Sequence, residues 1–393
     1  MNSAGKPPIF LDGFSTTPLA PEAREAMLEA LSVTGNAGSM HFAGEHAATT
    51  VMQARSAVAR LIGAAASEIT FTSGATEANN LAILGVARWA KKTRPERRRI
   101  IVSSIEHKAV SAPVDHLSAA GFEAVVAPVD VSGRVDLQAL SELVDDNTLL
   151  VCVMAANNET GAIQPVAEVT AMAHERGALV HCDAAQAAGK IAINVLSLGV
   201  DYLSLSAHKL YGPMGVGALY VSAVAPRPEP LQFGGGQQSG LRPGTEPVPL
   251  IAAFGAAADL ALKNMVSDSV HARDCTEKFL GRLAEHQLRF IKTAGEAKVI
   301  PGSLSLMLNG LEAEDLVMSV SRHVSISTGS ACSSGQIIPS HVLKAMGKSD
   351  IEARSIVRIF FNRYNTAADI LCGADIIAAA AGKLTRATGR FVQ

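Results

Sequence analysis

The chain has few cysteines, few charged residues and no block of charge of one sign. Its five cysteines are an odd number and include no C-x-x-C pair, so neither a disulfide framework nor a metal site is expected. The formal net charge is −2, and the one basic run, residues 94–99, is interpreted as a solvated helix end. Nucleic acid is therefore not an expected partner.

Targeting segments and two nucleotide motifs are also missing. Residues 1–8 contain no apolar signal core, and no uninterrupted apolar stretch is long enough to span a bilayer. No Gly-Lys-Ser/Thr follows the Ser73-Gly74 turn and no G-x-G-x-x-G follows a first strand, which argues against a P-loop and a nicotinamide site. We expect a soluble cytoplasmic protein that contacts no membrane.

The 393 residues, 48% of them hydrophobic, are enough for two unequal domains. We predict a large domain at 15–262 and a smaller α/β domain at 263–393, with residues 1–14 a candidate to pack on the second. Several β-rich runs are apolar on both faces, which predicts an α/β fold with a mainly parallel sheet between helices. Strands are expected at 69–72, 100–103, 124–127, 149–155, 179–182, 202–206 and 216–221.

Helical patterns separate and flank these strands. In the large domain they fall at 21–31, 47–61, 76–90, 137–144, 166–176 and 249–263. The smaller domain is expected to hold helices at 270–290, 314–321 and 340–346, a C-terminal helix, and strands at 303–308, 324–327 and 356–361.

A lysine follows one of the expected buried strands. Tyr202–Ser206 leads into His208-Lys209 and then into a turn rich in glycine and proline. Desolvation there would lower the pKa of Lys209 and favour the neutral amine that a Schiff base needs. The alternative is a lysine that only extends from the strand end to solvent. Ser206 and His208, which can donate to a phosphate, favour the first interpretation.

Two further strand ends carry groups that suit the same ligand. Residues 73–77 open a helix, where backbone N–H groups, the Thr76 hydroxyl and the helix dipole suit a phosphate, although a plain N-cap is the alternative. Asp183 follows a buried strand and would keep a pyridine nitrogen protonated, or would only cap a helix. Because ligands bind beyond the carboxyl ends of parallel strands, these groups are expected at one site.

Four more side chains are candidates. His107 ends a strand and would stack on a pyridine ring and move protons, or be a surface histidine. Asn157 would hydrogen-bond a ring substituent or a carboxylate. Arg358 would bind a substrate carboxylate or pair with an acidic residue. Cys332 lies in the small-residue run 327–335, where a thiol is expected to be accessible and reactive.

In their order along the chain, these segments resemble the cysteine desulfurases of the class V, fold-type I pyridoxal phosphate family. The resemblance is closest to the nitrogen-fixation and iron–sulfur-assembly type. The matching segments are 73–79, 106–108, 157–161, 181–186, 206–209, 234–237, 244–246 and 329–332.

The resemblance implies pyridoxal 5'-phosphate as cofactor and assigns roles to matching positions. Lys209 is the implied Schiff-base lysine, His107 a proton-transfer residue and Cys332 the nucleophile. Asn157 and Arg358 are the implied ligands of the substrate carboxylate. The implied cofactor ligands are Ala75, Thr76, His107, Asn157, Asp183, Gln186, Ser206, His208, Lys209 and, from the other subunit of a homodimer, Thr245.

The implied reaction converts L-cysteine to L-alanine and leaves a persulfide on Cys332 for an acceptor, either an iron–sulfur scaffold or a sulfur carrier. Alternatives are a selenocysteine lyase or class V aminotransferase on the same fold, or a non-catalytic partner that binds the cofactor. The sequence departs from the family at residues 12–17, at Ser239 and Leu241, and at 360–363. These departures leave the acceptor and the pathway open.

Overall fold

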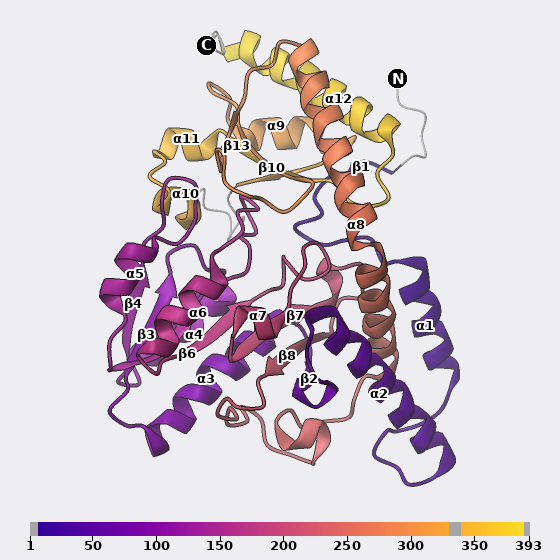
Figure 1. Cartoon of the computed structure of the whole chain (residues 1–393). Coiled ribbons are helices and arrows are strands. Elements are labelled where there is room, and N and C mark those ends of the chain that lie inside the picture. Colours follow the sequence, from indigo (N-terminus) through magenta and orange to yellow (C-terminus); the bar gives the residue numbers. More distant parts are fainter. Residues whose placement is uncertain (1–6, 330–338, 389–393) are drawn as a thin grey trace.

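A seven-stranded sheet forms the centre of the larger body in the computed structural model, which describes residues 7–329 and 339–388 (Figure 1). Its strand order is β2-β8-β7-β6-β5-β3-β4. Six strands run in the same direction and only β8 runs opposite to them, so the prediction of a mainly parallel sheet is confirmed. The strands are β2 (Ile69–Thr72), β3 (Arg99–Ser103), β4 (Glu123–Ala127), β5 (Thr148–Cys152), β6 (Leu179–Asp183), β7 (Tyr202–Ser206) and β8 (Gly217–Val221).

Alternate residues of the central strands enter different hydrophobic cores. Ile100 and Leu150 belong to the core that includes α3 (Ala75–Thr93) and α4 (Lys108–Ser118). Ile101 and Val151 belong to the core on the other face, with α2 (Phe42–Ile62) and α6 (Val166–Glu175). The sheet is therefore covered on both faces, which explains why its strands lack a polar side. Helices α1 (Pro21–Ser32), α5 (Leu137–Leu143) and α7 (Val195–Leu198) complete this body.

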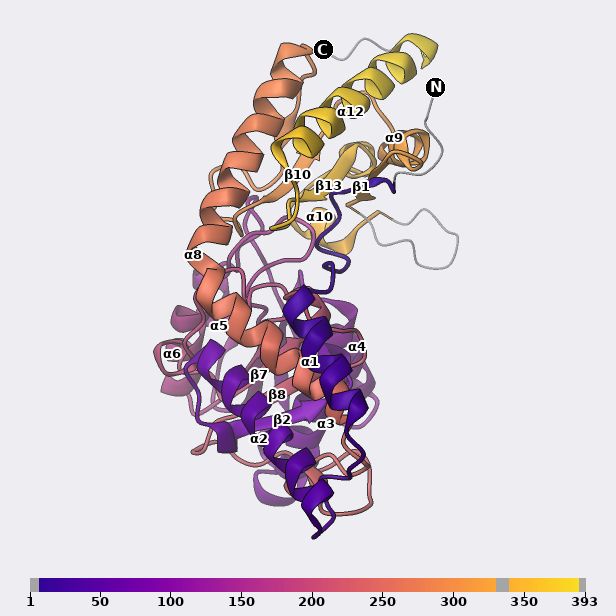
Figure 2. The same ribbon diagram turned by 90° about the vertical axis from the view of Figure 1, so that its right-hand side faces the viewer.

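One continuous helix, α8 (Val248–Glu285), links the larger body to the smaller one (Figures 1 and 2). The prediction of separate helices at 249–263 and 270–290 is wrong. The polar stretch 264–269 contains no glycine or proline, so it continues the helix on the solvent side, where Val266 is 79% exposed. The expected domain boundary at 262/263 falls inside this helix and stays a prediction.

Helix α8 is also the one helix of the described ranges that is long and apolar enough to cross a bilayer. Length and composition do not distinguish such a helix from a core helix. Here Phe254 packs in the core of the larger body and Phe279 in that of the smaller one. The apolar side chains of α8 thus serve two protein cores.

The smaller body contains a four-stranded antiparallel sheet in the order β12-β13-β10-β9. The two-residue strand β1 (Ile9–Phe10) pairs in parallel with β11 (Val324–Ser325), so the N-terminal segment lies on this body. The expected single strand at 324–327 is divided between β11 and β12. The remaining elements are β9 (Ile291–Lys292), β10 (Ser303–Met307), α9 (Ala313–Val320), β12 (Ser327–Thr328), α10 (His341–Ala345), α11 (Asp350–Arg354), β13 (Ile356–Phe360) and α12 (Ala367–Thr388).

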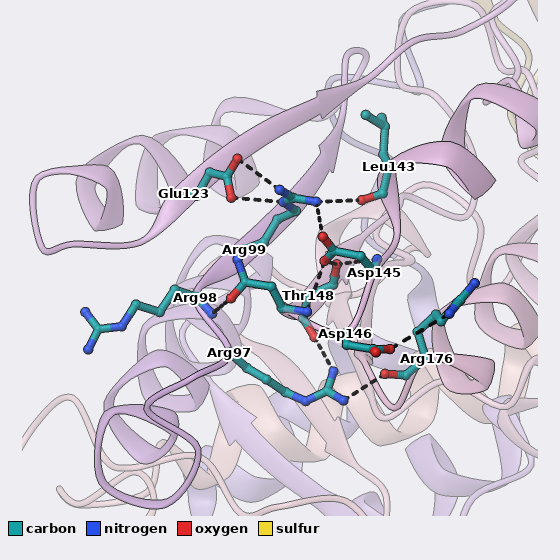
Figure 3. Close-up of polar contacts among 10 residues, drawn as sticks. Arg97, Arg98, Arg99, Glu123, Leu143, Asp145, Asp146, Thr148 and Arg176 are labelled. Atoms are coloured by element: carbon teal, nitrogen blue, oxygen red, sulfur yellow. Dashed lines mark hydrogen bonds and ion pairs between the residues drawn. The ribbon is translucent and has the colours of Figure 1, made fainter.

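The arginine run at 94–99 lies at the amino ends of the central strands (Figure 3). The guanidinium of Arg97 donates to the carbonyl oxygens of Thr148 (2.6 Å) and Arg176 (2.8 Å). Arg99 forms ion pairs with Glu123 (2.9 Å) and Asp145 (2.6 Å). The interpretation of this run as a solvated helix end is wrong for Arg97 and Arg99, which tie the beginnings of β3, β4 and β5 together.

Candidate active site

A cavity of about 530 Å³ lies at the carboxyl ends of β2, β6 and β7. Its volume is within the range of small-molecule sites. Nine residues named from the sequence line it, although their individual roles stay predictions: Ala75, Thr76, His107, Asp183, Gln186, Ser206, His208, Lys209 and Arg358.

Lys209 closes a short 3-10 turn, Ala207–Lys209, directly after β7. Its Nζ donates to the main-chain oxygens of Phe14 (2.5 Å) and Ser15 (2.7 Å). Burial lowers the pKa of Lys209 to about 8; repulsion from Arg358 adds to this, while Asp12 and Asp183 act in the opposite direction. A substantial fraction of this amine is therefore neutral, and nucleophilic, near physiological pH.

Asp183, the last residue of β6, is held by two donors. Its Oδ2 accepts from the Asn79 amide (2.8 Å) and its Oδ1 from the backbone N–H of Ala185 (2.9 Å). Asn79 was not predicted as part of the site. It lies four residues after Ala75 on α3, so the helical repeat was a signal that could have identified it. The result is a fixed carboxylate that faces the cavity.

The first turn of α3 offers donors to an anion. Its N-cap, Gly74, has no side chain that can accept from the first-turn N–H groups, which leaves them available to a ligand. A Cβ on Gly217 would lie 2.6 Å from the Gly74 Cα, so glycine at 217 allows β8 to pass beside this turn. Thr76 and Ser206 line the same end of the cavity.

Glu77 brings a carboxylate close to this turn, but the carboxylate is neutralised. It accepts from the backbone N–H of Ser73 (2.7 Å) and pairs with Arg242 (2.8 Å). These contacts lower its pKa although burial acts in the opposite direction. The ion pair therefore reduces the repulsion that an anionic ligand would meet at this end of the cavity.

His107 caps the N-terminus of α4 and faces the cavity. Its Nδ1 accepts from the backbone N–H of Ala109 (3.1 Å), which places the proton of the neutral ring on Nε2. Desolvation lowers the pKa of His107, and the charge of Lys209 lowers it further, while Asp183 raises it. A neutral imidazole of this kind can accept or return a proton within the cavity.

Arg358 reaches the cavity from β13 of the smaller body. It donates to Asp12 (3.0 Å) and to the main-chain oxygen of Asn158 (3.0 Å), and its guanidinium lies 5.7 Å from the centre of the Phe14 ring. The acidic partner that the sequence left open is thus Asp12. Among the described residues, one N–H of each terminal nitrogen is used, and the second N–H of each remains for a substrate carboxylate.

Two predicted residues that the structure describes, Asn157 and Thr245, are not brought to the cavity wall. The Asn157 amide is fully buried and organises its own turn: its Oδ1 accepts from the backbone N–H groups of Glu159 (2.8 Å) and Thr160 (3.0 Å). Its neighbour Asn158 lines the cavity instead. Thr245 does not line it within one chain, and Cys332 lies outside the described residues. Their roles stay predictions.

The side chains and N–H groups that line the cavity suit pyridoxal phosphate. The uncapped start of α3, with Thr76 and Ser206, offers donors for its phosphate. The fixed carboxylate of Asp183 suits a protonated ring nitrogen, and the amine of Lys209 suits the aldehyde carbon. Because three chemically different requirements are met in one cavity, the residues present fit this cofactor.

Comparisons with known proteins agree with this chemistry. The family model for class V aminotransferases matches residues 9–371. Cysteine desulfurase IscS of Rickettsia felis is 39% identical over 380 residues, which are 96% of this chain and 92% of that protein. The solved structure of a NifS-like protein superposes with a TM-score of 0.89 at 35% identity, covering 96% of this chain and 100% of that one.

A third similar protein was solved with an amino acid bound. SspA in complex with cysteine superposes with a TM-score of 0.79 at 34% identity and covers 91% of this chain and 99% of that one. The region that the family model matches, residues 9–371, includes every described strand of the large sheet. The chain therefore belongs to the class V aminotransferase family of pyridoxal phosphate enzymes and, within it, to the cysteine desulfurases.

Proposed function

We propose that this protein takes sulfur from L-cysteine, releases L-alanine and passes the sulfur from Cys332 to an acceptor protein. The observation that carries the proposal is the convergence of Lys209, Asp183 and Arg358 on one cavity from three strands of two sheets. The similarity to IscS proteins and to a protein solved with cysteine supports it.

Bound pyridoxal phosphate supplies a protonated ring that stores the electron pair released at the substrate Cα. Asp183 keeps the ring nitrogen protonated, and the bonds from Asn79 and Ala185 hold its carboxylate in place. Arg358, oriented by Asp12 and Asn158, binds the substrate carboxylate. The pKa of about 8 allows Lys209 to take the Cα proton as a neutral amine. His107 holds or returns a proton at Nε2.

Sulfur transfer requires a thiolate, for which the sequence offers Cys332. The thiolate sulfur attacks the sulfur of the substrate, an S–S bond forms and the substrate C–S bond breaks. The electron pair of that bond stays with the substrate carbon, which is then protonated to give alanine. The sulfur left on Cys332 as a persulfide passes to a thiol of the acceptor, an iron–sulfur scaffold or a sulfur carrier.

The active form in this proposal is a homodimer in the cytoplasm, in which Thr245 of the partner subunit completes the phosphate site. A groove between α1, α2 and α8 supports a second copy as its occupant, because small residues such as Ala26, Ala54 and Ala256 line it beside polar ones and would allow a close approach. Leu31 and Met52 on the same helices are 62% and 61% exposed. Sedimentation of the holoenzyme tests the dimer.

The function is tested with purified, cofactor-loaded protein and L-cysteine in the presence of a reductant. We expect equal amounts of alanine and sulfide, and a persulfide on Cys332 by mass spectrometry in the absence of reductant. Cys332→Ala should keep the cofactor and lose alanine production, whereas the matched control Cys372→Ala, at an exposed site, should remain active. Product formation that requires a keto acid would indicate an aminotransferase, and turnover of selenocysteine alone would indicate a lyase.

The acceptor is identified by trapping. A pull-down from cell extract with persulfide-loaded protein, followed by mass spectrometry of mixed disulfides, should capture an acceptor cysteine. Capture that persists with Cys332→Ala would contradict transfer from this residue.

A further inference from the structure

A second lysine, Lys190, is buried beside the cavity, at the end of the turn that follows β6. Its side chain is 8% exposed, and its Nζ donates to two oxygens of one residue, the main-chain oxygen of Gln186 (3.0 Å) and the Gln186 Oε1 (3.3 Å). Among the described residues, no carboxylate lies within ion-pair distance of this Nζ. Burial holds the pKa of Lys190 well below its usual range, and Lys209 lowers it further. A neutral amine has two N–H groups, which match the two acceptors.

This double contact fixes the orientation of the Gln186 amide. Its Oε1 accepts from Lys190, so its Nε2 points the other way and donates to the main-chain oxygen of Phe14 (2.9 Å). The same Phe14 oxygen accepts from Lys209. The Phe14 carbonyl oxygen can only accept and so requires this orientation, and the Lys190 amine agrees with it because its two N–H groups are directed to the two Gln186 oxygens. Gln186 lines the cavity, and its Nε2 has a second N–H group besides the one that donates to Phe14.

In the part of the chain that the structure describes, Gln186 is the only polar partner of the Lys190 amine. Its Nζ lies 5.4 Å from the centre of the Phe360 ring, which packs 4.8 Å from the ring of Phe14. Phe360 has room because residue 13 is glycine: a Cβ there would lie 2.3 Å from the Phe360 Cδ1. The aromatic pair excludes water from the amine and directs its N–H groups to Gln186.

We propose that Lys190 is a positioning residue of the cofactor site: it holds Gln186 so that an N–H group, and not the amide oxygen, faces the ring hydroxyl oxygen of pyridoxal phosphate. This inference rests on the proposed function and on the role of cofactor ligand that the family resemblance implies for Gln186. Lys190 itself touches neither cofactor nor substrate and acts through Gln186 alone.

The proposal has a spectroscopic consequence. An N–H donor stabilises the ring oxygen as an anion and so lowers the pH at which the bound cofactor changes its visible absorption. Loss of the donor should move that midpoint to higher pH by about half a unit to one unit, the size expected for one hydrogen bond. The dissociation constant of the cofactor should rise by about five- to tenfold for the same reason.

The test is a double-mutant cycle in the full chain, with Lys190→Met, Gln186→Ala and the pair. Each protein is loaded with pyridoxal phosphate, and the absorption midpoint and the cofactor dissociation constant are measured. We expect Lys190→Met to shift both in the direction of Gln186→Ala and to have no further effect when Gln186 is already alanine. Lys292→Met, at an exposed position in β9, is the matched control and should leave both unchanged.

Two outcomes would overturn the proposal. Either Lys190→Met leaves the midpoint and affinity unchanged while only lowering thermal stability, or its shifts add in full to those of Gln186→Ala. If the methionine variant does not fold, Lys190→Gln retains an amide N–H on a shorter side chain and allows the same cycle. A wild-type protein that gains no visible band with pyridoxal phosphate would instead refute the proposed function.

Discussion

Charged side chains have opposite surroundings at the two edges of the seven-stranded sheet that are formed by the amino ends and the carboxyl ends of its strands. At the amino ends of β3 to β5, Arg99 meets two carboxylates and Arg97 meets two carbonyl oxygens (Figure 3). At the carboxyl ends, Lys209 has only carbonyl oxygens as hydrogen-bond partners and a pKa near 8, and Lys190 has no carboxylate partner in the described chain.

The difference distinguishes structural from chemical use of charge. A paired arginine keeps its charge and joins segments of backbone, which stabilises the fold. Burial without a partner destabilises the charged form of an amine and so makes the amine more nucleophilic. That property is useful only where a reaction takes place.

The largest effect is expected for Lys209→Ala. Loss of the base should reduce alanine formation from L-cysteine by at least about a thousandfold, within the range that one positioned base contributes. The fold should persist, because the removed amine is desolvated and no carboxylate of the described residues lies within hydrogen-bond reach of it. Alanine assays and thermal melting measure the two quantities, with Lys263→Ala on the exposed face of α8 as control. Retention of a tenth of the activity would remove Lys209 from the mechanism.

A smaller effect, on stability, is expected for Gly13→Ala. The new Cβ would lie 2.3 Å from the Phe360 Cδ1, and overpacking of this kind costs about 1–3 kcal/mol. Denaturant unfolding should show this loss. Phe360→Val should relieve the clash, so the double variant should be more stable than the sum of the single effects predicts. Additive losses would mean that glycine at 13 is not required by the aromatic ring.

The sequence predicted the groups at the carboxyl edge that are local to strand ends. Ser206, Lys209 and Asp183 could be placed because each follows an apolar run that forms a buried strand. The partner of Arg358 could not be predicted, because Asp12 is 346 residues away in the chain. The sequence showed Gly13 only as part of a departure from the family. The structure explains the glycine by the Phe360 ring, which packs against it from a distant segment of the chain.

Helix α8 and Asn157 show two further limits of sequence reasoning. Separate helices were expected at 249–263 and 270–290, yet one helix continues through residues 264–269 from one core to the other. Asn157 was proposed as a ligand from its place after an apolar run and from the resemblance, whereas its buried amide bonds to its own turn. Periodicity locates a strand end but does not determine which of two adjacent side chains turns inward.

The pH dependence of cofactor capture sharpens the comparison between the two edges. Capture requires neutral Lys209, so its rate in cofactor-free protein should rise about tenfold per pH unit and level off above about 8. Stopped-flow absorbance measures this rate. Arg358→Gln should move the plateau to higher pH, because Arg358 repels the ammonium form while Asp12 and Asp183 would then attract it more strongly. A rate that still rises near pH 10 would mean that this amine has an ordinary pKa.

The smallest effect is expected at the opposite edge, for Arg99→Ala. Its ion pairs are partly open to solvent, with side-chain exposures of 22% for Arg99 and 49% for Glu123, so their loss should cost about 1 kcal/mol or less of unfolding free energy. Because exposed ion pairs are screened, the difference from wild type should shrink at high salt. Turnover and the cofactor absorption midpoint should stay unchanged, since the described partners of the Arg99 side chain, Glu123, Leu143 and Asp145, do not line the cavity. A fall in turnover without loss of stability would show that the two edges are coupled through the strands, and the division between structural and chemical charge would then fail.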